Sequence, residues 1–457
     1  MAWRAIAVGG DGGAVVRAGV VGVGESGGVG RNGDGLGVGA GVVLGGNTAG
    51  APVPSSVGLA ARLDGIVSGR AIGGDAAAAV VDAATGSVLY GYQADQLMPP
   101  ASTDKIATAL AVLERVPGTQ RLVTSVVQGS PADQLVLVGG GDVTLSSNGA
   151  SPDPDFRPAN LAVLAGRTAS VLKARGTTSV RLGYDASVFA GPSLARSWSA
   201  GAVSGSIAPV RGLEVDEGRI IPGREFSGRY PDPARAAASA FASALGKVGI
   251  TVAGSVDEVA APVSAERVAQ VESPPLTDLV EHMLTVSDDD LAEALGHLAA
   301  RAAGLPTTFD GAVAATMDTL RGLGVDTGEV QLQDSSGLSH ADRISPLALA
   351  GMLAVAASPA HAELRAALTG LPIAGFTGTL GQGRFTAASA GGIGVVRAKT
   401  GTLDGVATEA GVVEDADGRL LAYAVMADKA PDAALTRSQL DGFAAALVSC
   451  GCRPPRH

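Results

Sequence analysis

The chain has 457 residues, a formal net charge of −11 and only 3% aromatic residues. A chain of this length can form two or three domains, and its apolar residues are sufficient for a sizeable core. It has no long basic run and few aromatic side chains on which bases could stack, so nucleic-acid binding is not expected.

The N-terminal segment, residues 1–52, is rich in glycine and lacks the periodicity of a helix or strand. It is therefore not expected to join a packed core. Arg31, the weakly apolar stretch 35–44 and the small residues 49–51 together resemble a poor export signal. A disordered tail and a misassigned start codon are the alternatives. Residues 22–27 match a dinucleotide-binding pattern, but no helix-forming run follows them, so this function is not expected.

Beyond residue 57 the sequence has the pattern of a folded protein. Residues 76–81 and 88–92 are predicted to form a hairpin. A helix is predicted to begin near Ser102, and its apolar residues at helical spacing are Ile106, Leu110, Leu113 and Val116. Nowhere does the chain reach the run of about 18 apolar residues that predicts a transmembrane helix.

Lysine is scarce: the chain has five lysines, and 28 of its 33 basic residues are arginine. Arginine keeps its proton in proteins, whereas a partly buried lysine can act as a base. Lys105 follows Ser102 by three residues, so the two side chains share one face of the predicted helix. A serine at a helix start can attack a carbonyl while backbone N–H groups steady the oxyanion, and the lysine can take its proton. Alternatively, Ser102 caps the helix and Lys105 is a solvated charge.

Residues 121–255 form a separate unit in this prediction. Strands are expected at 122–128, 134–138 and 180–184, and helices at 159–174 and 233–248. The segment carries no catalytic constellation. We interpret it as an accessory domain that shapes a groove or docks a partner.

A polar interruption divides the next predicted helix, residues 276–303. Ser287, Asp288, Asp289 and Asp290 separate its two halves and would place short polar side chains in a cleft. The alternative is structural, because Asp290 and Glu293 have the spacing of a capping box.

The last chemical motif follows a short strand at 394–398, where the sequence reads Lys399-Thr400-Gly401-Thr402. Strands at 408–413 and 420–426 are expected after it, joined by a turn. This residue set suits a carboxylate ligand. The ammonium supplies charge, the threonines donate hydrogen bonds and the glycine lets the backbone approach.

In order and context, these motifs resemble the D-Ala-D-Ala carboxypeptidase/endopeptidase family of low-molecular-weight penicillin-binding proteins (class C, peptidase S13 type). The shared set is Ser-x-x-Lys, Ser-x-Asn and Lys-Thr-Gly. The resemblance covers about residues 60–445, and its further segments are 100–103, 137–142, 334–339 and 376–380. It implies an α+β, serine β-lactamase/transpeptidase-like fold, with an antiparallel sheet flanked by helices. Residues 57–120 and 256–450 would form this catalytic domain, and 121–255 would be inserted.

The resemblance also implies roles for individual residues. Ser102 would be the nucleophile, Lys105 the general base and Ser287 a proton relay. The terminal carboxylate would be held by Lys399, Thr400, Gly401 and Thr402. Backbone N–H groups of Ser102 and Thr402 would form the oxyanion hole.

The implied protein is a serine D-Ala-D-Ala carboxypeptidase that acts on peptidoglycan stem peptides and is covalently inhibited by β-lactams. Its preference for carboxypeptidase or endopeptidase activity is left open. No cofactor or metal is expected. The substrate implies a secreted, periplasmic or cell-wall-associated protein, with peripheral membrane or cell-wall association. The two cysteines, Cys450 and Cys452, are too few and too close for a disulfide framework; they are free thiols or pair with another chain.

One position departs from the family pattern. Asp289 occupies the site of the asparagine whose amide would donate to the substrate, and an ionised carboxylate can only accept. A second expected asparagine appears as Asp342. The lost donor would weaken substrate binding by about 1–3 kcal/mol. A weakened or inactive peptidoglycan-binding or penicillin-sensing homologue is therefore the main alternative.

A β-lactamase or esterase on this fold stays open as a further alternative; it would need an efficient deacylating water, and the sequence shows no clear dedicated glutamate for it. A Ser-His-Asp hydrolase is disfavoured, because it would need a histidine in a recognisable motif, and none of the five histidines occupies one.

Overall fold

The computed structural model describes residues 50–69, 72, 75–149, 151, 153, 155–199, 201, 205–224, 227–430 and 432–451. Most of the candidate export signal, the glycine-rich stretch 22–27 and Cys452 lie outside these residues. Cys450 is a buried free thiol. Among the described residues, no single helix is long and apolar enough to span a membrane. One pair of helices, Pro346–Ala357 and Pro359–Thr369, reaches that length and composition together, with an angle of 101° between them.

The first sheet has five strands in the order β2-β1-β11-β10-β9, and all of its pairs are antiparallel. The predicted hairpin and the predicted strands at 408–413 and 420–426 are confirmed. The strand predicted at 394–398 is wrong in its bounds, because β9 begins at Arg397 and runs through the Lys-Thr-Gly motif to Leu403. The bounds of the strands in this sheet are β1 (Asp75–Asp82), β2 (Val88–Tyr92), β9 (Arg397–Leu403), β10 (Val406–Glu414) and β11 (Leu420–Asp428). Strands far apart in the sequence are thus neighbours, since β1 pairs with β11 from Asp75 opposite Asp428 to Asp82 opposite Leu421.

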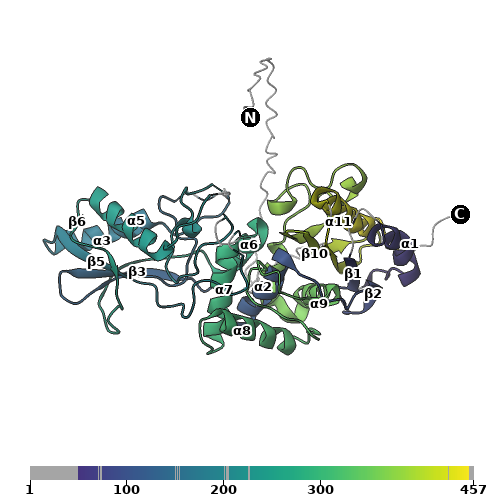
Figure 1. The fold of residues 1–457 in the computed structure, drawn as a ribbon, viewed down its shortest axis with the longest axis horizontal. Coiled ribbons are helices and arrows are strands. Elements are labelled where there is room, and N and C mark those ends of the chain that lie inside the picture. The colour runs from purple at the N-terminus through teal and green to yellow at the C-terminus, as the bar shows by residue number, and fades with distance from the viewer. Residues whose placement is uncertain are drawn as a thin grey trace, which may run out of the picture. The chain divides into compact units, whose positions relative to one another are not determined.

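Helices cover both faces of this sheet (Figure 1). Successive side chains of a strand point to opposite faces. Accordingly, Ala77 and Ala79 of β1 belong to a core shared with α2 (Lys105–Arg115) and α9 (Pro346–Ala357). Ala76 and Ala78 belong to a second core with α1 (Ser56–Val67) and α11 (Ala433–Val448). The central strands therefore read as continuous apolar runs.

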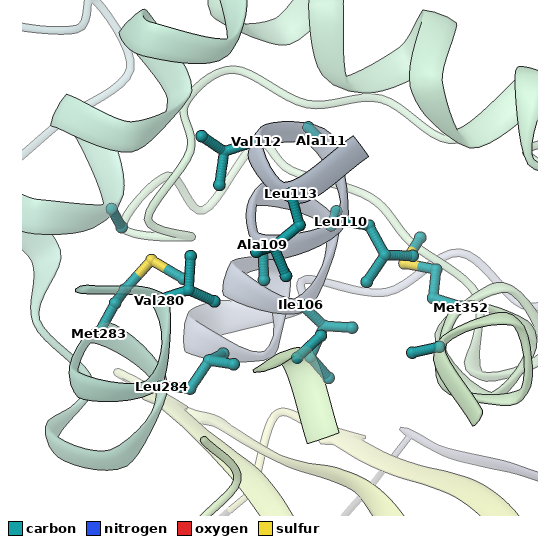
Figure 2. Packing of buried hydrophobic residues seen from close by; sticks show 14 of the residues in the cluster. Ile106, Ala109, Leu110, Ala111, Val112, Leu113, Val280, Met283, Leu284 and Met352 are labelled. Carbon is teal, nitrogen blue, oxygen red and sulfur yellow. The ribbon is translucent and has the colours of Figure 1, made fainter. Parts of the chain in front are cut away.

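Helix α2 is buried along most of its length, from Lys105 to Leu113. A short 3-10 turn, Ala101–Asp104, precedes it, so the predicted helix start near Ser102 is confirmed. Figure 2 shows its apolar side chains between those of α6 (Leu276–Val286) and Met352 of α9. Helix α2 therefore lies in the interior, and its buried residues include the polar side chains of Lys105 and Thr108.

A second, mixed sheet has the strand order β6-β5-β4-β3-β8, and β7 pairs with β5. The strands and helices predicted between 121 and 255 are confirmed within about two residues. This unit contains β3 (Val123–Gln128), β4 (Gln134–Val138), α3 (Leu161–Ala174), β5 (Ser179–Asp185), α5 (Pro233–Lys247), β6 (Thr251–Val252), β7 (Asp257–Glu258) and β8 (Arg267–Glu272). Because β7 and β8 lie beyond residue 255, we propose that the inserted segment extends to about residue 273.

The remaining helices, α7 (Asp289–Ala302), α8 (Phe309–Gly322) and α10 (Ala366–Thr369), pack against α2. The remaining short 3-10 turns lie elsewhere in the fold or beside them, at Asp216–Gly218, Pro359–Arg365, Gly378–Leu380 and Ala387–Gly392. The division of the predicted helix 276–303 into α6 and α7 is confirmed.

We expect Leu110→Ala to lower the free energy of unfolding by about 2–5 kcal/mol, because Leu110 is fully buried in the core around α2. Urea denaturation followed by circular dichroism measures this change. The matched control is Leu435→Ala on α11, where the side chain is 46% exposed and the expected change is within about 0.5 kcal/mol. A similar small effect at Leu110 would contradict the central position of α2.

Candidate active site

The three sequence motifs meet at one place in the fold. Ser102 lies in the turn before α2, Lys105 is the first residue of α2, and Ser287 lies between α6 and α7. Asp289 begins α7, and Lys399 lies in β9. Hydrogen bonds connect Lys105 to the first and second motifs, and Lys399 to the second.

Gly401 allows β9 to pass close to the turn that carries Ser102. A Cβ atom at Gly401 would lie 2.7 Å from the carbonyl oxygen of Pro100 and 2.2 Å from Oγ1 of Thr408. Any side chain at this position would push the strand away from the serine. The glycine of the Lys-Thr-Gly motif is therefore required by packing.

Lys105 is fully buried, and its ammonium group makes three hydrogen bonds. Nζ donates to Oγ of Ser102 at 3.0 Å, to Oδ1 of Asp289 at 2.6 Å and to the carbonyl oxygen of Ser336 at 2.7 Å. A lysine ammonium has three N–H donors, so all of them are used. Ser102 itself is half-buried and can be reached from solvent. The alternative of a solvated Lys105 charge is wrong.

Lys399 is the second buried lysine of the site. Its Nζ donates to Oγ of Ser287 at 2.8 Å and to the carbonyl oxygen of Thr400 at 2.8 Å. Oγ1 of Thr400 donates to Oγ1 of Thr379 at 2.8 Å, while Thr402 is exposed. Burial, with a further contribution from the charge of Lys105, holds the pKa of Lys399 well below its usual value.

Asp289 faces Lys105 with a side chain that is only 13% exposed. Burial raises the pKa of this carboxyl, and the charge and hydrogen bond of Lys105 oppose the increase. The sequence predicted an acceptor at this position where the family has a donor. In the structure, that acceptor is directed at the general base proposed for the reaction.

The carboxylates on either side of Asp289 are bound by other parts of the chain. Asp288 caps α7 by accepting from the N–H of Leu291 at 2.7 Å. Asp290 accepts from the N–H of Ala208 at 2.7 Å and lies 3.2 Å from Arg229. The inserted segment therefore fixes the loop that presents Ser287 and Asp289, a role that no sequence signal indicated.

The proposed capping box of Asp290 and Glu293 is wrong. Asp288, not Asp290, caps the helix, and Oε1 of Glu293 accepts from the N–H of Ser335 at 3.0 Å. Both side chains bind segments distant in the sequence instead of the helix end, which spacing alone does not reveal.

The loop 334–339 completes the surroundings of Lys105. The carboxylate of Asp334 accepts from the backbone N–H groups of Ser336, Gly337 and Ser339, and so bends the loop around itself. A Cβ atom at Gly337 would lie 1.9 Å from the carbonyl oxygen of Ala101. This close approach brings the Ser336 carbonyl to Lys105. The sequence identified the loop but not this role.

Ser287 has left-handed backbone angles, with φ 62° and ψ 43°. Such angles are unfavourable for a residue with a Cβ atom and persist where the surrounding structure imposes them. This conformation ends α6 and lets Ser287 Oγ reach Lys399.

A cleft of about 890 Å³ opens beside these residues. Its walls include Thr285 and Val286, which directly precede Ser287, and Thr377 and Gly378, which precede Thr379. The inserted segment contributes Phe156, whose ring stacks on His282 with centroids 3.9 Å apart. The cleft thus adjoins the hydrogen-bonded residues rather than enclosing them.

Known proteins show which family has this combination. The chain matches the D-Ala-D-Ala carboxypeptidase 3 (S13) family over residues 59–228 and 222–447. It is 36% identical over 409 residues to a carboxypeptidase of Mycobacterium tuberculosis, covering 88% of this chain and 86% of that protein. The chain belongs to the S13 family. A second relative of similar coverage, carboxypeptidase DacB of Mycolicibacterium smegmatis, is 35% identical over 419 residues.

Membership in the S13 family places the chain among the serine-type D-Ala-D-Ala carboxypeptidases, which are cell-wall enzymes. The resemblance found in the sequence is confirmed. The fold is confirmed as well, by penicillin-binding protein 4 of Haemophilus influenzae. That structure has a TM-score of 0.70 at 21% identity and covers 86% of this chain and 98% of its own. The same Haemophilus protein has been solved in complex with a β-lactam.

The lowered pKa of Lys399 predicts how substrate binding depends on pH. An ammonium is charged below its pKa and neutral above it, so attraction for a substrate carboxylate is lost as pH rises through that pKa. Because the pKa is depressed, we expect KM for a peptide ending in D-Ala-D-Ala to increase well below pH 10.5. Steady-state kinetics over a pH series measures this increase.

The matched variant for this experiment is Lys399→Arg, since arginine stays charged throughout the range. Its KM should be higher at neutral pH because the geometry is changed, but it should not vary with pH in this range. A wild-type KM that stays constant up to pH 10.5 would contradict the depressed pKa.

Proposed function

We propose that Ser102 is the nucleophile of this carboxypeptidase, that Lys105 and Ser287 move the protons of the reaction, and that Lys399 binds the substrate carboxylate. The observation that carries this proposal is the 3.0 Å contact between Nζ of Lys105 and Oγ of Ser102, on a serine accessible to solvent. A nucleophile within hydrogen-bonding distance of a lysine base is the arrangement that activates a serine hydroxyl.

In the proposed acylation step, Oγ of Ser102 attacks the carbonyl carbon of the penultimate D-Ala. The hydroxyl proton passes to the neutral amine of Lys105. The carbon–nitrogen bond then breaks, and Lys105 returns this proton to the leaving amine with Ser287 as the relay, so that Lys105 is a neutral amine again. Lys399 donates a hydrogen bond to Oγ of Ser287 and positions it. Free D-Ala departs, and the ester on Ser102 remains. Backbone N–H groups of Ser102 and Thr402 are proposed to stabilise the oxyanion.

Deacylation is proposed to use the same residues, with water in place of the Ser102 hydroxyl as the attacking group. Water attacks the ester carbonyl, its proton is taken by Lys105, and the ester carbon–oxygen bond breaks. Ser102 recovers its hydroxyl proton and the shortened peptide leaves. A β-lactam would acylate Ser102 by the same attack, with opening of its ring.

The substrate carboxylate is proposed to bind Lys399, Thr400 and Thr402, the groups that line the end of β9. The adjoining cleft offers space for the rest of a peptidoglycan stem peptide. This substrate lies outside the cytoplasm, so we propose a secreted, periplasmic or cell-wall-associated protein, with peripheral membrane or cell-wall association.

Asp289 supports a second candidate, a homologue with weakened turnover that binds peptidoglycan or senses penicillin. Nζ of Lys105 has all three of its donors engaged, so it must be released from part of this network before it can accept the proton of Ser102. The carboxylate of Asp289, 2.6 Å away, is the charged partner in this network and holds Lys105 in place. It also places an acceptor where the substrate carbonyl needs a donor. Both effects slow acylation without removing the nucleophile.

Intact mass after incubation with benzylpenicillin tests the assignment of Ser102. We expect the wild type to gain the mass of one penicillin and Ser102→Ala to gain none, because the hydroxyl forms the covalent bond. The matched control is Ser170→Ala on α3, where the side chain is exposed and bonds only the local helix backbone. An adduct that persists on Ser102→Ala would refute the assignment.

Asp289→Asn separates the two candidates. Replacing the acceptor by an amide restores a donor and removes the charge that pairs with Lys105. We expect kcat/KM for a D-Ala-D-Ala peptide to rise about 10- to 100-fold, which corresponds to about 1–3 kcal/mol. The control Asp310→Asn, an exposed residue of α8, should leave the rate unchanged. A fall in kcat/KM would show instead that the carboxylate serves the reaction.

A further inference from the structure

A group of carboxylates lies behind the reaction residues and is not used by the proposed mechanism. Asp104, Asp334 and Asp342 are each at most 1% exposed. They come from the turn before α2, the loop 334–339 and the segment after it. Their oxygen atoms lie within 4.8 Å of one another. Only the folded chain brings them together, and the sequence spacing gives no sign of a ligand set.

The three carboxylates differ in how many of their oxygen atoms accept a hydrogen bond. Asp334 accepts from three backbone N–H groups and from Nε1 of Trp198 at 2.7 Å. Asp104 has no hydrogen-bond partner at either oxygen, although it is fully buried. Asp342 accepts at Oδ1 from the N–H of Gln333 at 2.6 Å, but its Oδ2 has no partner. Buried polar atoms without partners are rare and need a physical explanation.

Lys105, the positively charged residue next to Asp104 in the chain, does not supply the missing hydrogen bonds. Lys105 directly follows Asp104, but its three N–H donors are directed at Ser102, Asp289 and Ser336. Burial and repulsion from Asp334 raise the pKa of Asp104 well above its usual range and that of Asp342 to about 11. The unpartnered oxygens of Asp104 and Asp342 are therefore left without a protein donor.

We propose that Asp104, Asp334 and Asp342 bind a hard divalent cation, of which Ca²⁺ is the best fit. Oxygen-only ligands select Ca²⁺, Mg²⁺ or Mn²⁺ over softer metals. Ligand oxygens up to 4.8 Å apart can surround one ion at Ca–O distances of about 2.4 Å. The unpartnered oxygens of Asp104 and Asp342 are the independent observation that indicates a ligand.

The ion would act on the active site through the loop 334–339. Asp334 holds that loop by its backbone, and the loop presents the Ser336 carbonyl to Lys105. Asp104 adjoins Lys105 in the chain. A bound cation would therefore brace both sides of the lysine and stabilise the fold around it. The proposal concerns the folded chain and does not depend on which reaction Ser102 performs.

Terbium luminescence tests the site directly, because Trp198 donates a hydrogen bond to one of the proposed ligands. Tb³⁺ is added to the full-length protein after EDTA treatment, and tryptophan is excited. We expect saturable Tb³⁺ emission that Ca²⁺ displaces. Ca²⁺ in about hundredfold excess over its Kd should also raise Tm by about 5 °C.

Variants separate this site from others on an acidic protein. Trp198→Phe should abolish the emission but retain the Ca²⁺-dependent rise in Tm. Asp104→Asn with Asp342→Asn should abolish both, since the shapes are kept and two charges are lost. The control is Glu114→Gln, because Glu114, His361 and Glu363 form a second, more exposed group of ligand atoms. It should change neither signal.

Two results would overturn the proposal. The first is wild-type protein at pH 8 that shows neither tryptophan-sensitised emission nor a Tm shift with Ca²⁺, Mg²⁺ or Mn²⁺; the carboxylates then hold protons alone. The second is emission that persists in the double asparagine variant, which would place the ion elsewhere. If that variant does not fold, the wild-type Tm titration and the Glu114→Gln control still decide between these outcomes.

Discussion

The buried ammonium of Lys105 is the interaction on which the site depends. It joins the turn before α2, the start of α7 and the loop 334–339 through three hydrogen bonds. A buried charge is stable only when it is paired and fully hydrogen-bonded, so these three segments must meet with little freedom. The same requirement explains why two glycines allow backbones to touch here, Gly337 against Ala101 and Gly401 against Pro100.

The need to bury Lys105 explains the packing of the helices and the sheet around it. Helix α2 must be enclosed on all sides to bury it, and the chain supplies two helical cores separated by an alanine-rich sheet. The inserted segment then fixes the loop beyond Ser287 by binding Asp290 through Ala208 and Arg229. It is part of the active-site scaffold as well as a wall of the adjoining cleft.

Local patterns predicted the elements well, and motif order predicted which residues would meet. The hairpin 76–92, the start of α2 and the division at Ser287 depend on periodicity and turn chemistry, which neighbouring residues determine. The partners of the acidic residues could not be obtained in this way. Asp290 and Glu293 have the spacing of a capping box, yet they bind segments 82 and 42 residues away. Contacts with distant segments, and not the local spacing, determine what the carboxylates of Asp290 and Glu293 bind.

The left-handed backbone at Ser287 has a consequence for evolution and engineering. A residue with a Cβ atom in that conformation carries a strain of about 1–3 kcal/mol, which glycine would relieve. Selection for thermal stability alone would therefore favour glycine at 287, yet glycine has no hydroxyl to bond with Lys399. If Ser287 relays protons as proposed, stability and turnover favour different residues at this position. A glycine at the matching position of a relative would then relieve the strain and remove the proposed relay.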